Sequence, residues 1–338
     1  MQGLADHACA GNQPAASPSG RGPGAPPEPQ VALRASDGTV LTVGAGRCAL
    51  MGILNLTPDS FSDGGRYSQS ERALARIDQL IADGAELIDI GAESTRPGAE
   101  LLSQEAEWER LREVVTALSR RRVPAVLSID TRHLEIAARA ADAGFRLLNL
   151  TFPRHVLAAL APEGAPTDRP IAAVLGAFDG FVMMHARGTP ATMKQLTDYG
   201  PDLCNTLIRE LADVVSALTD PMLRARVIYD PGLGFAKTPE QSLQLLGQIG
   251  RLREELGGPV LVGASRKSLL GAATGLPVEE RLLPSVVAAV LAAQQGAAIV
   301  RVHDVAPTRA ALALLRAVDQ AVAPAPPSRA QSAAGGLR

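Results

Sequence analysis

Eight short β-rich runs, separated by stretches of helical periodicity, limit what this chain can fold into more than any other feature of its sequence. Each run is rich in valine, isoleucine and leucine, as expected of strands that are buried on both faces. Strands that alternate with helices predict a parallel sheet, because each parallel connection needs a crossover. The predicted strands are residues 49–54, 86–90, 125–129, 146–150, 181–184, 226–229, 260–263 and 298–302.

The stretches between the runs carry apolar residues at helical spacing. Four such faces are Leu74, Ile77 and Ile81; Trp108, Leu111, Val115 and Leu118; Leu203, Leu207, Leu211 and Leu218; and Leu245, Ile249, Leu252 and Leu256. This alternation fits a closed (β/α)₈ TIM barrel or an open, doubly wound sheet. No GxGxxG motif follows the first strand, which disfavours a dinucleotide-binding open sheet. We therefore predict an α/β protein with a (β/α)₈ barrel.

The two ends of the chain differ in composition from its middle. Of the first 30 residues, 17 are Gly, Pro or Ala, and residues 322–338 have the same character. Such segments bury too little apolar surface to offset the entropy lost on ordering. We predict a disordered leader over residues 1–30, a disordered tail over 322–338 and a single barrel domain over 31–321.

Composition excludes several classes of partner. Lys and Arg number 33 against 35 Asp and Glu, a net charge of −2, and aromatic residues make up only 3% of the chain. Binding of nucleic acid through bulk positive charge or base stacking is therefore not expected. Residues 286–293 form an apolar run too short to span a bilayer, so no membrane partner is expected. The separated cysteines Cys9, Cys48 and Cys204, with no secretory signal pattern, predict a cytoplasmic protein.

Polar side chains occur where nearly every predicted strand ends, which is the end at which barrel enzymes carry their active sites. These strand-end residues are Asn55, Asp89, Asp130, Asn149, His185 and Asp230, followed by the segments Ser265-Arg266-Lys267 and Arg301-Val302-His303-Asp304. Taken singly, Asp130 also fits a helix cap, Asp230 a turn and Lys267 a solvated surface position. Their convergence at one barrel mouth predicts a site for a polar ligand.

Arg301 and His303 are two positions apart, so on a strand they point to the same side. The loops after the last two barrel strands often bind phosphate, and an arginine offers it two parallel donors. Mg²⁺ keeps several waters and prefers oxygen ligands, so the Asn55 side chain with substrate phosphates would suffice to hold it. Two long glycine-rich loops, which carry Asp63, Thr95 and Arg96, are expected to help bind these groups.

Six segments resemble, in order, the signature segments of the dihydropteroate synthases, a family of pterin-binding TIM barrels. The first, MGILNLTPDSFSDGG at residues 51–65, is long and specific, and the second is IDIGAESTRPG at 88–98. The others are SIDT at 128–131, DPGLGFAK at 230–237, GASRKS at 263–268 and RVHDV at 301–305. The resemblance covers about residues 47–318.

The resemblance implies a transferase of folate biosynthesis, usually a homodimer. Such an enzyme condenses (7,8-dihydropterin-6-yl)methyl diphosphate with 4-aminobenzoate and releases 7,8-dihydropteroate and diphosphate. The pterin ring would be held by Asp130, Asn149, Asp230 and Lys267. The diphosphate would be held by Asn55, Arg301 and His303 with Mg²⁺, under loops that carry Asp63 and Arg96. The aminobenzoate would be flanked by Ser265, Lys267, Phe235, Phe61, Thr95 and Pro97. The residues expected to be catalytic are Lys267, Asp130, Asp230, Arg301, Asp63 and Arg96.

The chain departs from the family pattern in a few places. Ala92 stands where the family has a second glycine, and would restrict the backbone if φ there were positive. Leu150 stands where the family has an aspartate, which leaves the ordering of the following loop in question. The Ala186-Arg187 pair after His185 is also atypical.

Three other functions compete with an active synthase. The pterin-binding barrel of corrinoid-dependent methyltransferases shares the ring pocket, but has no need of the phosphate-binding segments. A relative that binds pterin and turns over slowly would fit the changes at Ala92 and Leu150. A sugar-phosphate barrel enzyme is the third.

The homodimer is implied by the resemblance alone. The unusually apolar segment 282–293, with Val287 near its middle, is our candidate for the interface helix; its pattern fits a helix packed on the barrel equally well.

Overall fold

The computed structural model describes residues 29–44, 46–57, 66–94, 99, 101–151 and 171–322. The strands in this part of the chain are β1 (Val31–Arg34), β2 (Val40–Val43), β3 (Ala49–Asn55), β4 (Leu87–Gly91), β5 (Val126–Thr131), β6 (Leu147–Leu150), β7 (Gly180–Met184), β8 (Val227–Asp230), β9 (Leu261–Val262) and β10 (Ile299–Val302). The α-helices are α1 (Arg66–Ala82), α2 (Gln104–Leu118), α3 (Leu134–Asp142), α5 (Ile171–Gly176), α6 (Leu203–Ser216), α7 (Pro221–Arg224), α8 (Pro239–Leu246), α9 (Ile249–Leu256), α10 (Ser268–Thr274), α11 (Leu282–Gln294) and α12 (Val305–Val322). Two 3₁₀ helices, η2 (Met193–Gln195) and η3 (Val278–Glu280), complete the described elements.

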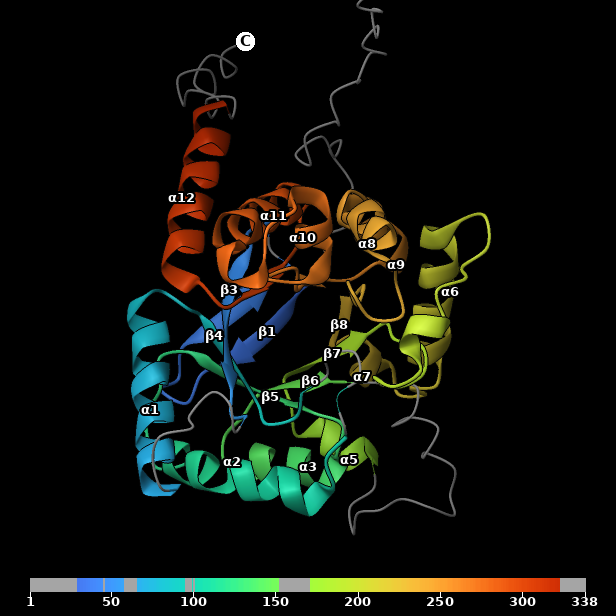
Figure 1. Cartoon of the computed structure of the whole chain (residues 1–338). Helices are drawn as coiled ribbons and strands as arrows, with labels where there is room; N and C mark the ends of the chain where they lie inside the picture. Colours follow the sequence, from blue (N-terminus) through green and yellow to red (C-terminus); the bar gives the residue numbers. More distant parts are fainter. Residues whose placement is uncertain are drawn as a thin grey trace, which may run out of the picture.

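Eight strands form one parallel sheet in the order β8-β7-β6-β5-β4-β3-β10-β9. The first and last strands of this order, β8 and β9, also meet, because Tyr229 of β8 forms a parallel bridge with Val260, just before β9. The backbone N–H of Tyr229 donates to the carbonyl of Pro259 at 2.9 Å. The sheet is therefore closed, and the helices surround it (Figure 1). The predicted (β/α)₈ barrel is confirmed, and all eight predicted strands lie within two residues of the observed bounds.

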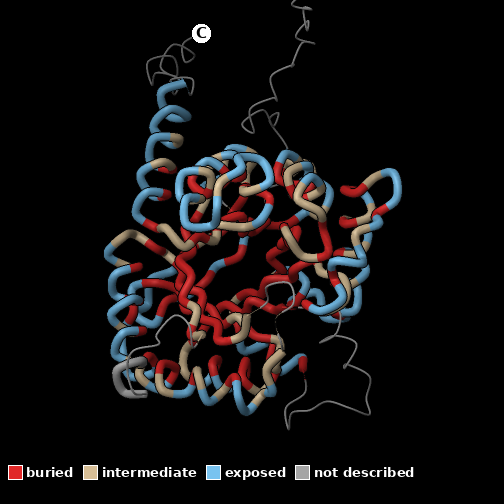
Figure 2. The backbone as a smooth tube through the Cα atoms, viewed as in Figure 1, coloured by how far each residue is buried: buried red, intermediate tan, exposed pale blue. Residues whose placement is uncertain are grey.

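Side chains alternate between the two faces of each barrel strand, so the barrel has an outer and an inner core. The outer core packs strand residues such as Ile88, Leu148 and Phe181 against the helices. The inner core is a separate apolar cluster inside the barrel, and its strand members include Met51, Leu87, Val126, Leu147, Val182, Ile228, Leu261 and Ile299. Figure 2 shows the same layering, with buried residues in the strands and exposed residues on the outer surfaces of the helices.

The hairpin of β1 and β2 closes the N-terminal end of the barrel, and sequence reasoning did not predict it. Its strands pair antiparallel from Val31 with Val43 to Arg34 with Val40. Its buried side chains join the inner core. Gly180, the first residue of β7, lies directly against it: an added Cβ would be 2.9 Å from Val31 Cγ1. The Asp-Gly turn between two alternating runs was the available signal.

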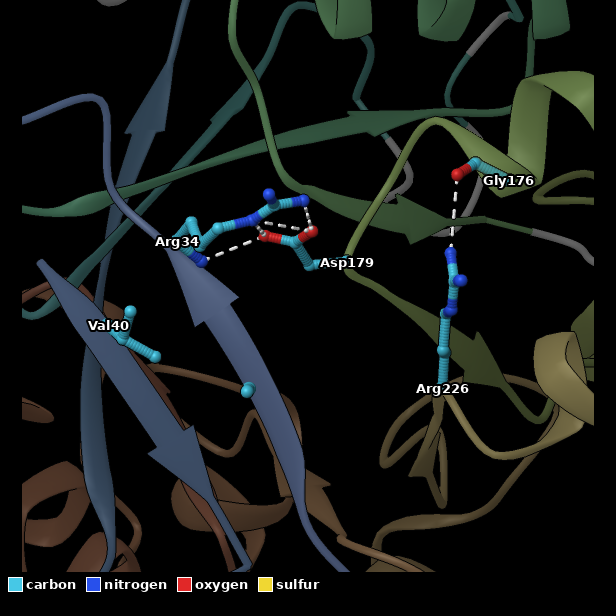
Figure 3. A pocket seen from close by; sticks show the side chains of 6 residues that line it. Arg34, Val40, Gly176, Asp179 and Arg226 are labelled. Carbon is cyan, nitrogen blue, oxygen red and sulfur yellow. Dashed lines mark hydrogen bonds and ion pairs between the residues drawn. The ribbon is translucent and has the colours of Figure 1, made fainter. Parts of the chain in front are cut away.

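A cavity of about 450 Å³ lies beside this hairpin, at the end of the barrel opposite the predicted site. Figure 3 shows Arg34 paired with Asp179, and Arg226 bonded to the carbonyl of Gly176. Asp179 and Arg226 immediately precede β7 and β8, which places the cavity at the N-terminal ends of these strands. The cavity is therefore separate from the strand-end residues singled out above.

One helical pattern in the sequence is divided in the structure. The face of Leu245, Ile249, Leu252 and Leu256 belongs to two helices, because α8 ends at Leu246 and α9 begins at Ile249. Thr238 starts α8 with a capping box, in which it exchanges hydrogen bonds with Gln241. No helix in the described ranges is long and apolar enough to cross a membrane.

Candidate active site

The inside of the barrel changes from apolar to polar toward the C-terminal ends of its strands. A residue two positions after an inner-core residue points inward again, one layer nearer the mouth. Asp89 follows Leu87 in this way, Asn149 follows Leu147 and Asp230 follows Ile228. Ser128 and Asp130 continue from Val126, and Arg301 and His303 continue from Ile299. The strand-end residues therefore form one polar layer above the apolar inner core.

Asp89 is at the centre of this layer and is fully buried. Its Oδ1 accepts a hydrogen bond from Ser128 Oγ at 2.5 Å. Its Oδ2 accepts from Asn149 Nδ2 at 2.9 Å and from Arg301 Nε at 2.6 Å. These donors satisfy a buried carboxylate, which in turn fixes the Asn149 amide and the Arg301 guanidinium in direction. The sequence predicts Asp89 at a strand end without a role; a lone carboxylate in an apolar strand is the signal that points to one.

Asp130 lies beside the same arginine. Its Oδ2 accepts from Arg301 Nη2 at 3.0 Å, and its Oδ1 accepts from Thr151 Oγ1 at 2.7 Å. Helix α3 begins at Leu134 with His133 as its N-cap, so Asp130 does not cap it. Burial and the Asp89 carboxylate raise the pKa of Asp130 to about 7, although Arg301 opposes the shift. Near neutral pH, Asp130 can therefore be ionised, and only accept hydrogen bonds, or be protonated, and also donate one.

Asp230 and Lys267 both contact the turn that follows β8, and each favours the charged form of the other. Asp230 Oδ1 accepts the backbone N–H of Gly232 at 2.7 Å, and burial raises the pKa of its carboxyl. Lys267 Nζ donates to the carbonyl of Leu233 at 2.7 Å and lies 5.0 Å from the centre of the Phe235 ring. Burial lowers the pKa of Lys267 to about 8. The structure thus brings together Asp230, Lys267 and Phe235, and Lys267 is not a freely solvated surface lysine.

Ser265 and His303 form a pair at the rim, next to this group. Ser265 Oγ accepts the backbone N–H of His303 at 3.2 Å and lies 3.0 Å from its Nδ1. When the Ser265 hydroxyl donates to Nδ1, the ring proton is on Nε2, which is then a donor. Arg301, on the same strand face, turns its Nε and Nη2 toward Asp89 and Asp130.

Asn55, the predicted Mg²⁺ ligand, ends β3 and pairs with Gly91 of β4. Within the described ranges, no group of three or more His, Cys, Asp or Glu residues is arranged to hold a metal ion. A metal site built from protein side chains alone is therefore not found there. One amide oxygen completed by water and substrate phosphates fits the way proteins bind Mg²⁺.

Several predicted site residues lie outside the described residues. They are Phe61 and Asp63 of the loop after β3, and Thr95, Arg96 and Pro97 of the loop after β4. Their predicted roles stay predictions.

The departures from the family pattern leave the described site intact. Among the described residues, the non-glycine positions with positive φ are Ala236 and Arg266, so Ala92 is not at a position that needs glycine. Ala92 is fully buried, and its carbonyl accepts from Arg110 Nη1 at 2.9 Å. Leu150 faces outward into the outer core, while its neighbour Asn149 faces the site. Neither change removes a polar group from the barrel mouth.

The arrangement suits a flat, polar ring with an anionic arm. Inward carboxylates and an amide offer acceptors and a donor to the edge of a heterocycle, as in the recognition of base edges. The guanidinium of Arg301, the ammonium of Lys267 and the imidazole of His303 offer donors to an anion. Such convergent polar groups above an apolar core are typical of small-molecule sites.

Comparisons with known proteins agree with this reading. The model of the family described as pterin binding enzyme matches residues 51–303. The chain is 41% identical over 269 residues to a dihydropteroate synthase of Synechocystis. The aligned region covers 77% of this chain and 86% of that protein. Among solved structures, Xanthomonas albilineans dihydropteroate synthase with 4-aminobenzoic acid matches with a TM-score of 0.72 and 36% identity, over 88% of this chain and 100% of that one. The Yersinia pestis dihydropteroate synthase with a sulfonamide drug complex matches with a TM-score of 0.72 and 35% identity, over 86% and 99%.

Proposed function

The chain belongs to the pterin binding enzyme family and, within it, to the dihydropteroate synthases, transferases that form dihydropteroate in folate biosynthesis; we propose that its polar layer binds a dihydropterin methyl diphosphate and joins it to 4-aminobenzoate. The observation that carries the proposal is the arrangement of Asp130, Asn149 and Asp230 above the inner core, with Arg301 tied to Asp89 and Asp130. Carboxylates can accept paired N–H groups from an aminopterin edge, and the Asn149 amide adds a further polar contact.

The reaction exchanges one bond at the pterin methylene carbon. The bond from this carbon to the diphosphate oxygen breaks, and a bond to the aniline nitrogen of 4-aminobenzoate forms. The nitrogen then loses one proton to solvent. As diphosphate leaves, positive charge develops on the methylene, which the Asp130 and Asp230 carboxylates can stabilise. Arg301 and His303 would stabilise the departing anion, so positioning and electrostatics supply the catalysis without a covalent enzyme intermediate.

The second substrate would lie on the side of the Lys267 ammonium. Lys267 lies by the Phe235 ring there, and Ser265, two residues before Lys267, adds a hydroxyl beside His303. We assign Phe61, Thr95 and Pro97 to the same subsite, and Asp63 and Arg96 to closure over the diphosphate. The aniline nitrogen is already a free base near neutral pH, so no nucleophile of the protein has to be activated.

Mg²⁺ would be held by the Asn55 side chain and by the diphosphate oxygens. When bound, the ion would neutralise part of the charge that develops on the leaving group. Arg301 and His303 would share that role from the protein side.

Formation of the product tests the proposed function. Purified protein is incubated with Mg²⁺, the dihydropterin diphosphate and 4-aminobenzoate, and 7,8-dihydropteroate is measured by mass spectrometry. We expect product only when both substrates are present. Tight pterin binding with no product would instead indicate the non-catalytic relative, and an absence of pterin binding would reject the site.

We also propose that the enzyme is a homodimer built on α11 and α12, which pack against each other. Leu283, Val287 and Leu291 follow one another at helical spacing on α11 and are exposed, Leu283 by 68%. The opposite face of α11 is buried on the barrel, so the helix carries two apolar faces. On α12, Leu314, Val318 and Val322 form a second exposed row. Exposed apolar rows on two neighbouring helices are typical of a protein–protein interface, and a two-fold dimer would bury both.

Sedimentation tests the dimer directly. We expect the wild-type chain to sediment as a dimer and Val287→Glu as a monomer, because the substitution buries an unpaired charge in the interface. Val40→Glu is the matched control, since it adds the same charge at an exposed position on the β1–β2 hairpin. Equal sedimentation of wild type and Val287→Glu would count against this interface.

We propose the cytosol as the compartment of the enzyme. The two cysteines in the described ranges, Cys48 and Cys204, are free thiols, as expected in a reducing environment. Fractionation of the source cells with an antibody against the chain would check it.

A further inference from the structure

The turn that follows β8 is held between two lysines, one of which has no place in the mechanism above. Lys267 approaches the turn from the barrel mouth and donates to the carbonyl of Leu233. Lys237 approaches from behind, and its Nζ donates to the carbonyls of Gly232 at 3.1 Å and Phe235 at 2.9 Å. The Lys237 side chain is buried, with 7% of the residue exposed. A buried ammonium is costly unless all its hydrogens find acceptors.

The third acceptor for Lys237 is His185, whose tautomer follows from its two hydrogen-bond partners. Lys237 Nζ lies 2.9 Å from His185 Nδ1, and His185 Nε2 lies 2.9 Å from Glu210 Oε2. Burial and Lys237 lower the pKa of His185 to about 4, so the imidazole is neutral at neutral pH. The proton on Nε2 is then donated to Glu210, and Nδ1 is free to accept from Lys237. All three hydrogens of the Lys237 ammonium are therefore used.

Several charged groups lie next to this chain of contacts. Arg187 donates to Glu210 at 2.5 and 3.1 Å and lies over the ring of Tyr199. Asp230 favours the charged form of Lys237, while burial, Lys267 and Arg187 oppose it and lower the pKa of Lys237 to about 7. The network links the end of β7 and helix α6 to the turn after β8.

The turn itself is strained and closely packed, so its shape depends on such contacts. Gly232 has φ of +64°, and a Cβ there would lie 1.9 Å from the carbonyl oxygen of His185. Ala236 also has positive φ, of 50°, and its carbonyl accepts from the Tyr199 hydroxyl at 3.0 Å. A non-glycine residue in this conformation is unfavourable, so the surrounding contacts must offset its cost.

We propose that Lys237 is a positioning residue for the pterin site. Its hydrogen bonds to the Gly232 and Phe235 carbonyls hold the turn between β8 and α8 in one conformation. In that conformation Asp230, Lys267 and the Phe235 ring are placed to contact the substrate. This inference rests on the proposed function, since it deepens the role of the same site. The hydrogen bonds of Lys237 go to His185 and to the two turn carbonyls, so they reach the predicted ring-binding side chains through the turn.

Binding of 6-hydroxymethylpterin, measured by isothermal titration, tests the inference. Lys237→Met keeps the length of the side chain and removes its donors, and we expect it to weaken binding about ten-fold, the effect of losing hydrogen bonds from a charged group. In turnover, the KM for the pterin substrate should rise more than kcat falls. Lys194→Met is the matched control, because Lys194 is an exposed lysine on η2, and it should bind like wild type.

A double-mutant cycle separates positioning from general destabilisation. If Lys237 acts by placing Lys267, the losses in Lys237→Met and Lys267→Met are less than additive when combined. Additive losses, or wild-type affinity in Lys237→Met, would overturn the inference. Should Lys237→Met not fold, Tyr199→Phe loosens the same turn at Ala236, and we expect it to weaken binding about three-fold. Unchanged affinity in a folded Tyr199→Phe would then overturn the inference. A wild-type protein that binds no pterin would instead reject the proposed function.

Discussion

Pterin binding should depend on the ionisation state of Asp130. Its pKa is raised to about 7 by burial and by the neighbouring Asp89 carboxylate. A protonated carboxyl offers one acceptor fewer to the N–H groups of the ring, so the ionised form should bind pterin more tightly. We expect affinity for 6-hydroxymethylpterin to rise as the pH is raised through about 7.

The matched variant is Asp130→Asn, which keeps the shape of the side chain and cannot ionise. Binding of 6-hydroxymethylpterin to this variant, measured over the same pH range, should be weaker, and its affinity should not rise near pH 7. A step of equal size in Asp130→Asn would assign the titration to another group. In the ligand-free protein the raised pKa has the opposite consequence: the folded state binds the extra proton, so this carboxyl lowers stability as the pH rises from 3.8 to about 7.

At the residue scale, the sequence predicts which side chains reach the barrel mouth, because strand alternation decides their direction. It does not predict their partners. Asp89 and Arg301 are 212 positions apart and meet only because β4 and β10 both flank β3 in the closed sheet. The same limit applies to Lys237, which the resemblance supplied as part of a motif without a role. Its contact with His185, which is in turn bonded to Glu210, arises from the packing of α6 and the β7 end.

At the element scale, the β1–β2 hairpin has a structural task at the end of the barrel remote from the site. Leu33 is fully buried and packs into the inner core. We expect Leu33→Ala to lower the free energy of unfolding by roughly 2–5 kcal/mol, the usual cost of such a cavity. Denaturant titration measures it, and Val40→Ala, at an exposed hairpin position, should change stability little.

Pterin affinity in Leu33→Ala should match that of wild type below the unfolding transition, because the inner core separates the hairpin from the polar layer. A large loss of affinity in the folded variant would show that the hairpin shapes the site, contrary to this account.

The eight barrel strands are predictable because they are buried on both faces and read as continuous apolar runs. The hairpin strands are buried on one face only, and the short alternating runs at 31–34 and 40–43 are a weaker signal. The division of one apolar pattern between α8 and α9 is also hidden in the sequence. Leu245 and Ile249 keep helical spacing across Gly247 and Gln248, although the backbone leaves the helix there.

At the scale of the whole molecule, the barrel has one polar end and one closed end. The hairpin closes the N-terminal end, while the polar layer from Asp89 to His303 opens toward the C-terminal ends of the strands. Both substrates must therefore meet at the same mouth, where the ring-binding carboxylates and the anion-binding cations are neighbours. The site is assembled from nearly every strand, which is why closure of the sheet is a condition for function.

Release of diphosphate by the purified enzyme is the measurement that tests the central claim most directly. Wild type, Asp130→Asn and the exposed control Asp213→Asn are compared in the presence of Mg²⁺, with both substrates and with each omitted. The account predicts release that requires both substrates, falls about 100-fold or more in Asp130→Asn through loss of transition-state stabilisation, and is unchanged in Asp213→Asn. Release without 4-aminobenzoate at the same rate, or an Asp130→Asn variant as active as wild type, would contradict it.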